Sequence, residues 1–162
     1  MNTETKKTLT FVAVAVALLA TAAVATRSRV ASPEAFADQG QPFFAEFTDP
    51  RSAAALEVID YDTATASAIP FKVEYNKEKG WVIPSHHDYP ADAKDRLART
   101  AAGVIDLKKD VIVSDRADQH EELGVLDPLD TKTTSLQGRG KRVTIKDGGG
   151  KVLADFIIGK PV

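Results

Sequence analysis

The N-terminal part of the chain contains an uncharged stretch that restricts the fold more than any other feature. It runs from Leu9 to Ala25 and reads LTFVAVAVALLATAAVA. Basic residues flank it on both sides: Lys6, Lys7, Arg27 and Arg29. A helix of this length extends roughly 25 Å, which is slightly short of the hydrocarbon core of a bilayer. A buried helix in a soluble fold would need other elements against every face. We therefore predict a transmembrane helix over residues 9–26.

Two interpretations of this segment remain open. In the first it is a retained signal anchor, with residues 1–8 in the cytoplasm. In the second it is a cleaved signal peptide, because Ala23-Val24-Ala25 has the small-x-small form that signal peptidase accepts. The length and the basic residues beyond the stretch favour the anchor. Both interpretations place the rest of the chain across the membrane, in the periplasm of a bacterium.

Composition narrows the class of protein further. The 162 residues include 21 basic and 23 acidic side chains, a net charge of −2, which does not favour a nucleic-acid partner. The chain has no cysteine, which excludes disulfides, thiolate metal sites and a cysteine nucleophile. A domain outside the cytoplasm without disulfides must be held by its core, which indicates a bacterial protein.

Residues 27–52 are expected to be a linker, and residues 53–162 an extracytoplasmic domain. The linker mixes proline, glycine and glutamine without a period. It also contains four phenylalanines, which we expect to dock it onto the domain: Phe36, Phe43, Phe44 and Phe47. The chain ends directly after a predicted strand, so we expect it to be truncated at its C-terminus relative to a longer protein.

Alternating apolar and polar residues predict the first strands of the domain. One strand begins near Ala53 and runs through Tyr61, and a second contains Phe71, Val73 and Tyr75. A loop ending at Gly80 leads into a third strand, Trp81-Val82-Ile83, which Pro84 ends. Trp81 is expected in the core.

The second half is expected to add one main helix and another hairpin. Asp88-Tyr89-Pro90 is predicted to start a helix over about residues 90–106, with Leu97, Ala101, Val104 and Ile105 on its buried face. Further elements follow in order: a buried strand at Val111-Ile112-Val113, a helical turn from Asp115 to Leu123 capped by Gly124, a loop from Asp127 to Gly140, and a hairpin of Arg142–Lys146 with Lys151–Ile158. The fold class is therefore α+β, a small antiparallel sheet of hairpins with one main helix packed on it.

The histidines are the most evident candidates for chemistry. His86 and His87 are adjacent, with Ser85 before them and Asp88 after them, and His120 lies elsewhere. Neighbouring residues of an extended chain point to opposite sides, so two adjacent histidines rarely bind one metal ion. Ser85 and His86 could form a nucleophile and its base, but no G-x-S-x-G turn is present. We therefore interpret residues 85–88 as a polar loop.

The remaining candidates are also interpreted as structural. Gly148-Gly149-Gly150 precedes a predicted strand, whereas a phosphate-binding loop must lead into a helix. The basic loop from Gly138 to Arg142 could contact acidic lipid head groups, but solvation is the default. Six carboxylates are expected on a charged surface: Asp115, Asp118, Glu121, Glu122, Asp127 and Asp130. Among them Asp118 and Glu122 share a helix face. We predict no catalytic, cofactor-binding or metal-binding residues, and no enzyme.

Several short motifs together resemble a known family. They are Gly80-Trp81-Val82-Ile83, Tyr89-Pro90-Ala91-Asp92-Ala93, His120 to Val125, Asp127-Pro128, and Phe156-Ile157-Ile158-Gly159. This order is similar to the bacterial domain of unknown function 4340 over roughly residues 56–160, with Val125 in place of the usual leucine. The resemblance implies an N-terminal membrane helix. Some members are described as auxiliary components of gliding-motility-type ABC transporters, and many are longer, with repeated units. The family supplies no catalytic residues.

The expected function is that of a membrane-anchored extracytoplasmic domain that contacts protein partners in the membrane or envelope. The resemblance adds an ABC-type transport system as a candidate partner. The alternative is a periplasmic or secreted binding module for a small molecule or envelope polymer, released by cleavage after Ala25.

Overall fold

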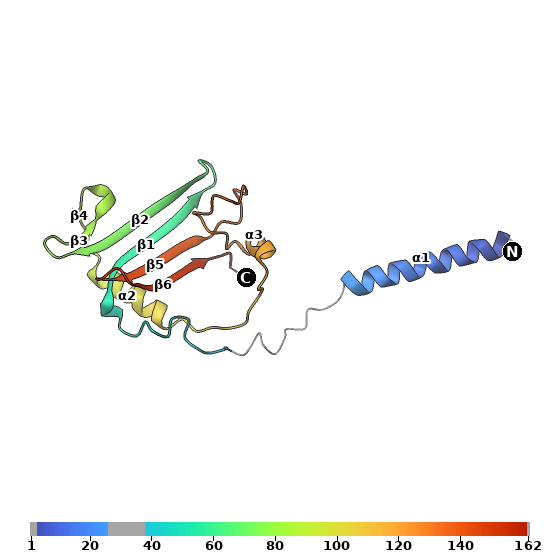
Figure 1. Cartoon of the computed structure of the whole chain (residues 1–162), viewed down its shortest axis with the longest axis horizontal. Helices are drawn as coiled ribbons and strands as arrows, with labels where there is room; N and C mark the ends of the chain where they lie inside the picture. The colour runs from blue at the N-terminus through green and yellow to red at the C-terminus, as the bar shows by residue number, and fades with distance from the viewer. Residues whose placement is uncertain (1–2, 26–37, 162) are drawn as a thin grey trace. The chain divides into compact units, whose positions relative to one another are not determined.

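The computed structural model describes residues 3–25 and 38–161, and it divides into two units, Met1–Glu34 and Ala35–Val162 (Figure 1). In the first unit, helix α1 covers Thr3–Ala25. Seven large apolar side chains along it are exposed by 53% or more: Leu9, Phe11, Val12, Val14, Val16, Leu18 and Leu19. At 100° per residue these positions cover more than half of the helix circumference. The hydroxyl of Thr21 donates to the carbonyls of Ala17 and Leu18, 3.0 and 2.9 Å away.

Within residues 3–25 and 38–161, no helix is both long enough and apolar enough to span a membrane.

The second unit contains one six-stranded sheet, so its α+β class is confirmed. Every pair of neighbouring strands is antiparallel, in the order β4-β3-β2-β1-β5-β6. The strands are β1 Ala53–Asp62, β2 Ser67–Asn76, β3 Gly80–Ile83, β4 Tyr89–Pro90, β5 Lys141–Asp147 and β6 Val152–Ile158. The helices are α2 Lys94–Ile105 and α3 His120–Leu123, with the 3-10 turns η2 Pro50–Ser52, η3 Pro84–His86 and η4 Ala117–Gln119.

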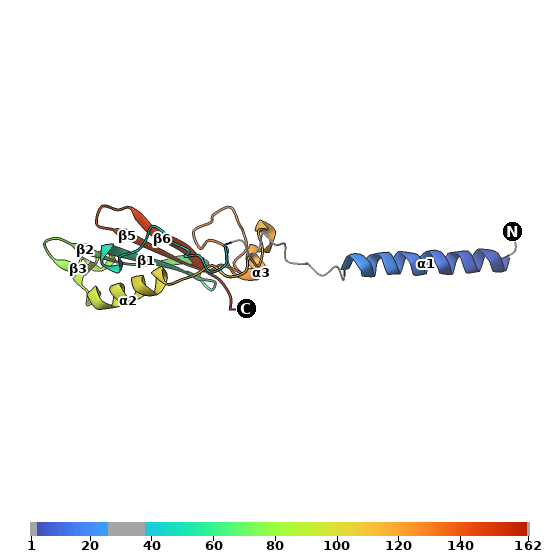
Figure 2. The same cartoon turned by 90° about the horizontal axis from the view of Figure 1, so that it is seen from below.

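The two faces of the sheet differ in character. The register places Leu56 beside Val73 and Ile145, and Ile145 beside Ala154, so these apolar residues share one face. Helix α2 covers that face (Figure 2). The next row, on the opposite face, is polar: Glu57, Lys72, Thr144 and Asp155. Alternation along each strand therefore separates the apolar face under α2 from a more polar face. On the second face Thr144, Ile59 and Val82 are nevertheless buried, with 8%, 5% and 1% exposure.

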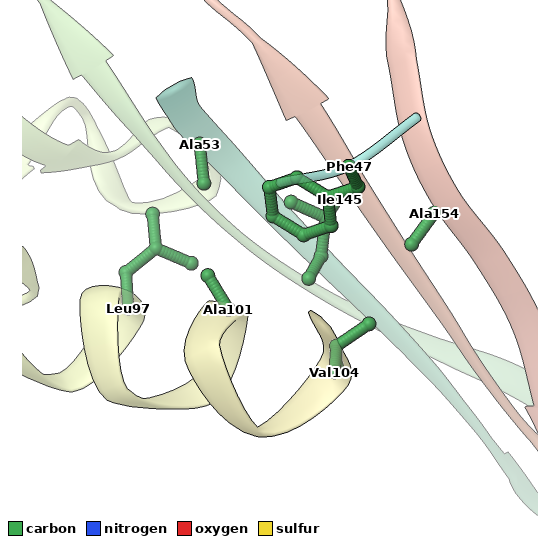
Figure 3. Packing of buried hydrophobic residues seen from close by; sticks show 7 residues of the cluster. All are labelled: Phe47, Ala53, Leu97, Ala101, Val104, Ile145 and Ala154. Atoms are coloured by element: carbon green, nitrogen blue, oxygen red, sulfur yellow. The ribbon is translucent and has the colours of Figure 1, made fainter. Parts of the chain in front are cut away.

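The core lies between α2 and the apolar face, and Figure 3 shows its members. The cluster consists of Phe47, Ala53, Leu97, Ala101, Val104, Ile145 and Ala154. The predicted helix stripe is thus confirmed: Leu97, Ala101 and Val104 are buried, and Ile105 packs partly against them. Trp81 is half-buried and packs against the same cluster.

The phenylalanines of the predicted linker differ in how deeply they are buried. Phe47 is 2% exposed and completes the core, although it precedes the first strand. The ring of Phe44 lies 5.7 Å from the ring of Phe156, whereas Phe43 stays 54% exposed. Docking is therefore confirmed for Phe44 and Phe47. Phe43 is held to the domain through its backbone, by the hydrogen bond from its amide to the Leu107 carbonyl, while its side chain stays largely exposed. Phe36 lies outside the described residues.

The predicted start of the main helix is wrong. Tyr89 and Pro90 form strand β4, which pairs with Ile83 and Val82, and α2 begins only at Lys94. The amide of Ala91 donates to the Trp81 carbonyl at 2.8 Å, which extends this pairing. A proline suits an edge strand as well as a first helical turn, because neither position needs its missing N–H. Pro90 forms an edge strand here because β3 offers it a free edge to pair with.

The predicted strand at Val111-Ile112-Val113 is also wrong. These residues form no strand, and their side chains are 43%, 55% and 65% exposed. β-Branched residues favour strands only where a pleated, half-buried surface is available for them. β6 is the last strand at one edge of the sheet, and it pairs with β5 alone among the described strands.

The remaining predicted elements are confirmed. The β2–β3 and β5–β6 hairpins form at the predicted turns. The helical turn before Gly124 is present as η4 and α3, and Gly124 caps it with φ +71°.

Candidate functional site

A groove of about 510 Å³ lies where the first turn of α2 crosses the sheet. It is lined by Pro50, Arg51, Ala53, Ala54, Tyr75, Trp81, Lys94, Asp95, Leu97 and Ala98. Tyr75 is the next-to-last residue of β2 and pairs with Trp81 of β3 in the sheet register. Their rings meet edge to face, 5.5 Å apart between centroids. The groove thus has an aromatic wall that two neighbouring strands hold in place.

Charged side chains surround this apolar interior. Arg51 has a side chain that is 89% exposed, and its Nε lies 3.6 Å from Oδ1 of Asp49. Lys94 and Asp95 belong to the first turn of α2 and are exposed. An apolar floor with a few charged groups at its rim is typical of sites that bind an apolar group and orient it by charge.

Sequence reasoning did not predict this groove, since Trp81 was assigned to the core alone. The groove combines residues from η2, β1, β2, β3 and α2, and no local pattern joins these segments. The alternation that predicted Tyr75 and Trp81 on strands was the available signal. Their shared face follows only from the hairpin register.

The structure brings Ser85 and His86 together but leaves them on the surface. The Ser85 hydroxyl and Nδ1 of His86 lie 3.0 Å apart, and both residues are exposed. His87 adopts the left-handed region with φ +56°, and Asp88 forms an ion pair with Lys79 at 2.7 Å. None of these residues lines the groove. Within residues 3–25 and 38–161, no three histidine or carboxylate side chains converge on a metal position.

The basic loop is not the solvated segment that was predicted, because Arg139 is enclosed by the chain. Its guanidinium donates to four backbone carbonyls at 2.8–3.0 Å, those of Asp127, Asp130, Thr133 and Ser135. Its Cζ also lies 4.5 Å from the centroid of the Tyr61 ring. The planar fork of arginine suits this many acceptors. Arg139 therefore holds the loop of residues 127–137 against the sheet.

The glycine triplet is a turn, as predicted. Oδ1 of Asp147 accepts hydrogen bonds from the amides of Gly149 and Lys151, at 2.8 and 2.9 Å. The amide of Gly150 donates to the carbonyl of Asp147 at 3.1 Å. The turn therefore closes on its own first residue.

The carboxylates do not form one cluster. Asp118 pairs with Arg116, Glu121 accepts from Ser135 at 2.7 Å, and Asp130 accepts from Thr133 at 2.7 Å. The hydrogen bond from Thr133 lowers the pKa of Asp130 below its ordinary value. Asp118, Glu121 and Asp130 therefore each have a local partner of their own.

One ionic network on the polar face was not predicted. Arg142 donates to Asp155 through Nε and Nη2, at 3.0 and 2.6 Å, and to Asp127 through Nη1 at 2.8 Å. Thr144 adds a hydrogen bond to Asp155 at 3.1 Å. Chiefly because of the bonds from Arg142, the pKa of Asp155 lies below its ordinary value. The network links strands β5 and β6 to the 127–137 loop.

This network predicts a loss of stability in acid. A carboxylate whose pKa is lowered by folding stabilises the folded state above its unfolded pKa of about 3.9, and the contribution disappears as the pH falls through the folded pKa. The urea concentration at the midpoint of unfolding should therefore decrease once the pH is lowered below about 4. Asp155→Asn should make this fall shallower, and Arg142→Gln should do the same. An unchanged slope in both variants would show that the network does not contribute.

Comparison with known proteins connects these features to a family. No curated protein and no solved structure matches the chain. The profile of the domain of unknown function DUF4340 matches residues 81–162, from the tryptophan of β3 through β6. The match covers half of the chain and includes the motifs from Trp81 to Gly159 that suggested the resemblance. The chain therefore belongs to the DUF4340 family.

Proposed function

We propose that this protein is a membrane-anchored extracytoplasmic domain that acts by binding protein partners. The observation that carries the proposal is the groove beside Tyr75 and Trp81, which presents an apolar, aromatic surface. Buried aromatic residues supply much of the binding energy at protein interfaces. A groove of about 510 Å³ has room for one or two apolar side chains of a partner.

Charges of both signs stand at the rim of the groove. Arg51 and Lys94 are positive, Asp95 is negative, and Asp49 already pairs with Arg51. A segment that inserts an apolar side chain and carries charged residues of both signs beside it would complement this rim. Contacts of this type set specificity and association rate more than affinity.

The proposed anchor is the N-terminal segment. The support is the uncharged run from Leu9 to Ala25, together with the exposure of its large side chains along α1. Apolar side chains exposed over most of a helix are costly in water and favourable in lipid. Lys6 and Lys7 favour an N-terminus in the cytoplasm and a domain outside it.

A partner within an ABC-type transport system is part of the proposal. Its support is the resemblance to the family, some of whose members are described as auxiliary components of such transporters. In that setting the groove would hold a segment of a membrane or envelope subunit, and the anchor would keep the domain beside it.

A matched pair of substitutions on α2 tests the groove. Ala98 lines it and Ala102 does not, and both are half-buried on the same helix. Ala98→Arg should fill the groove and reduce the co-purified partner at least tenfold in mild-detergent extracts of native membranes. Ala102→Arg should leave the complex intact. The amount of complex is measured by native electrophoresis, and far-UV circular dichroism verifies the fold of each variant.

The outcomes separate clearly. Equal complex formation by both variants would exclude the groove as the contact site. A full-length protein that migrates alone after mild crosslinking would contradict the proposal as a whole.

The alternative is a released binding module for a small molecule or envelope polymer. The volume of the groove favours it too, because ligand sites fall in the range of about 300–1,000 Å³. N-terminal sequencing of the mature protein separates the two proposals. A mature chain that starts at Thr26 would remove the anchor and favour the module.

A further inference from the structure

A second apolar surface lies on the domain, away from the residues that line the groove. It consists of Phe43, Leu107, Val111, Ile112 and Val113, which we call the entry patch. Their exposed fractions are 54%, 41%, 43%, 55% and 65%, in that order. Single exposed apolar residues are ordinary, but five in two adjoining segments indicate an interaction surface.

Backbone hydrogen bonds hold the two segments of the entry patch together. The amide of Phe43 donates to the carbonyl of Leu107 at 3.0 Å. The amide of Gly40 donates to the carbonyl of Lys109, and the amide of Lys109 donates to the carbonyl of Gln41, both at 2.8 Å. Side chains reinforce this ladder, because Lys109 pairs with Asp38 at 2.9 Å and Gln39 donates to Asp110 at 2.9 Å. The ladder thus holds Phe43 and Leu107 together, and Val111–Val113 follow directly after its last residue, Asp110.

The position of the entry patch in the chain suggests its occupant. The ladder lies where the chain from the N-terminal segment joins the domain, and Phe43 is five residues beyond Asp38. About a dozen residues separate Asp38 from Ala25, so even a fully extended connection spans no more than roughly 45 Å. An anchored domain would therefore keep this surface within reach of the bilayer at all times.

Charge does not oppose contact with lipid. Residues 106–116 carry three basic and three acidic side chains, so the segment around the patch is neutral. The attraction would come from apolar burial at the boundary between head groups and acyl chains, where short apolar segments of peripheral proteins insert.

We propose that the entry patch inserts into the interfacial region of the bilayer that holds the anchor. This inference rests on the proposed anchoring. It assigns a role to Val111-Ile112-Val113, which has strand-forming residues but no strand partner in the described chain. It also fixes which side of the domain faces the membrane.

The absence of cysteine makes a direct test possible, because one introduced cysteine can be labelled uniquely. The full-length chain is prepared as Ile112→Cys and, as a control, Leu129→Cys, whose residue is 49% exposed in the 127–137 loop. Each variant carries a polarity-sensitive NBD fluorophore in vesicles of phosphatidylcholine and phosphatidylglycerol. A second set of vesicles contains lipid with a nitroxide near the head group. We expect blue-shifted NBD emission and at least twofold quenching by the nitroxide at position 112, and neither effect at position 129.

Three results would overturn the inference. Emission at position 112 that equals that of position 129 would place the patch in water. A blue shift without quenching would indicate contact with protein, such as a second copy of the chain. Equal quenching at both positions would indicate nonspecific adsorption of the domain. Flotation of the vesicles separates this inference from the anchoring, because a chain that does not float contradicts the anchor itself.

Discussion

Replacing Phe47 with alanine should lower the free energy of unfolding of the domain by about 3–5 kcal/mol. Phe47 is 2% exposed and lies in the cluster with Leu97 and Ile145 (Figure 3). Truncation of its ring removes buried apolar area and leaves a cavity between α2 and the sheet. The measurement is urea denaturation of the full-length chain in mild detergent, followed by the emission of Trp81, its single tryptophan.

Phe43 supplies the matched control for this prediction. It is the same residue type four positions earlier, and it is 54% exposed. Phe43→Ala should change the free energy of unfolding by no more than about 0.5 kcal/mol. If the two variants were equally stable, Phe47 would not be part of the core. The comparison also tests whether the segment before β1 belongs to the folded domain.

Gly138→Ala should destabilise the domain by about 2–4 kcal/mol. Gly138 has φ +72°, a left-handed conformation that alanine adopts at a cost of roughly 1–2 kcal/mol. A Cβ atom there would also lie 2.3 Å from the backbone oxygen of Glu121, which no side-chain rotation can relieve. The amide of Leu126 donates to the Gly138 carbonyl at 3.0 Å, so a shift of this residue would also disturb the start of the 127–137 loop.

Gly103→Ala is the control and should act in the opposite direction. Gly103 lies inside α2, and an added Cβ would meet no atom within 4 Å. Alanine at an open helical position is more favourable than glycine by roughly 0.5–1 kcal/mol. The same urea titration measures both variants. A destabilised Gly103→Ala, or a Gly138→Ala equal to the parent, would contradict the described backbone.

Local patterns predicted the parts of the fold that local physics decides. Alternation identified the strands around Val73 and Val82, and the 3.6-residue period identified the buried face of α2 at Leu97, Ala101 and Val104. The αL cap at Gly124 followed from the glycine after a helical turn. In each case the residues that give the signal are also the residues that form the contact.

The other parts of the fold, and the groove, depend on contacts between residues that are distant in the sequence. Pro90 fits either a helix start or an edge strand, and the exposed edge of β3 determined the outcome. Arg139 lies in a basic, glycine-rich loop, and only the folded loop supplies the four carbonyls around its guanidinium. The groove was missed for the same reason, because Trp81 and Ala98 approach each other only after α2 packs on the sheet.

The order of the strands has a consequence for where this protein can be cut. The family match begins at Trp81, so it contains β3 to β6 but neither β1 nor β2. In the sheet β1 and β2 lie between β3 and β5 and make every hydrogen-bonded connection between the two outer pairs. A fragment that starts at residue 81 would consist of two separate hairpins with no shared sheet. The stretch that the family model matches and the stretch that folds are therefore different lengths of this chain, and an expression fragment must include Phe47 at its N-terminal side.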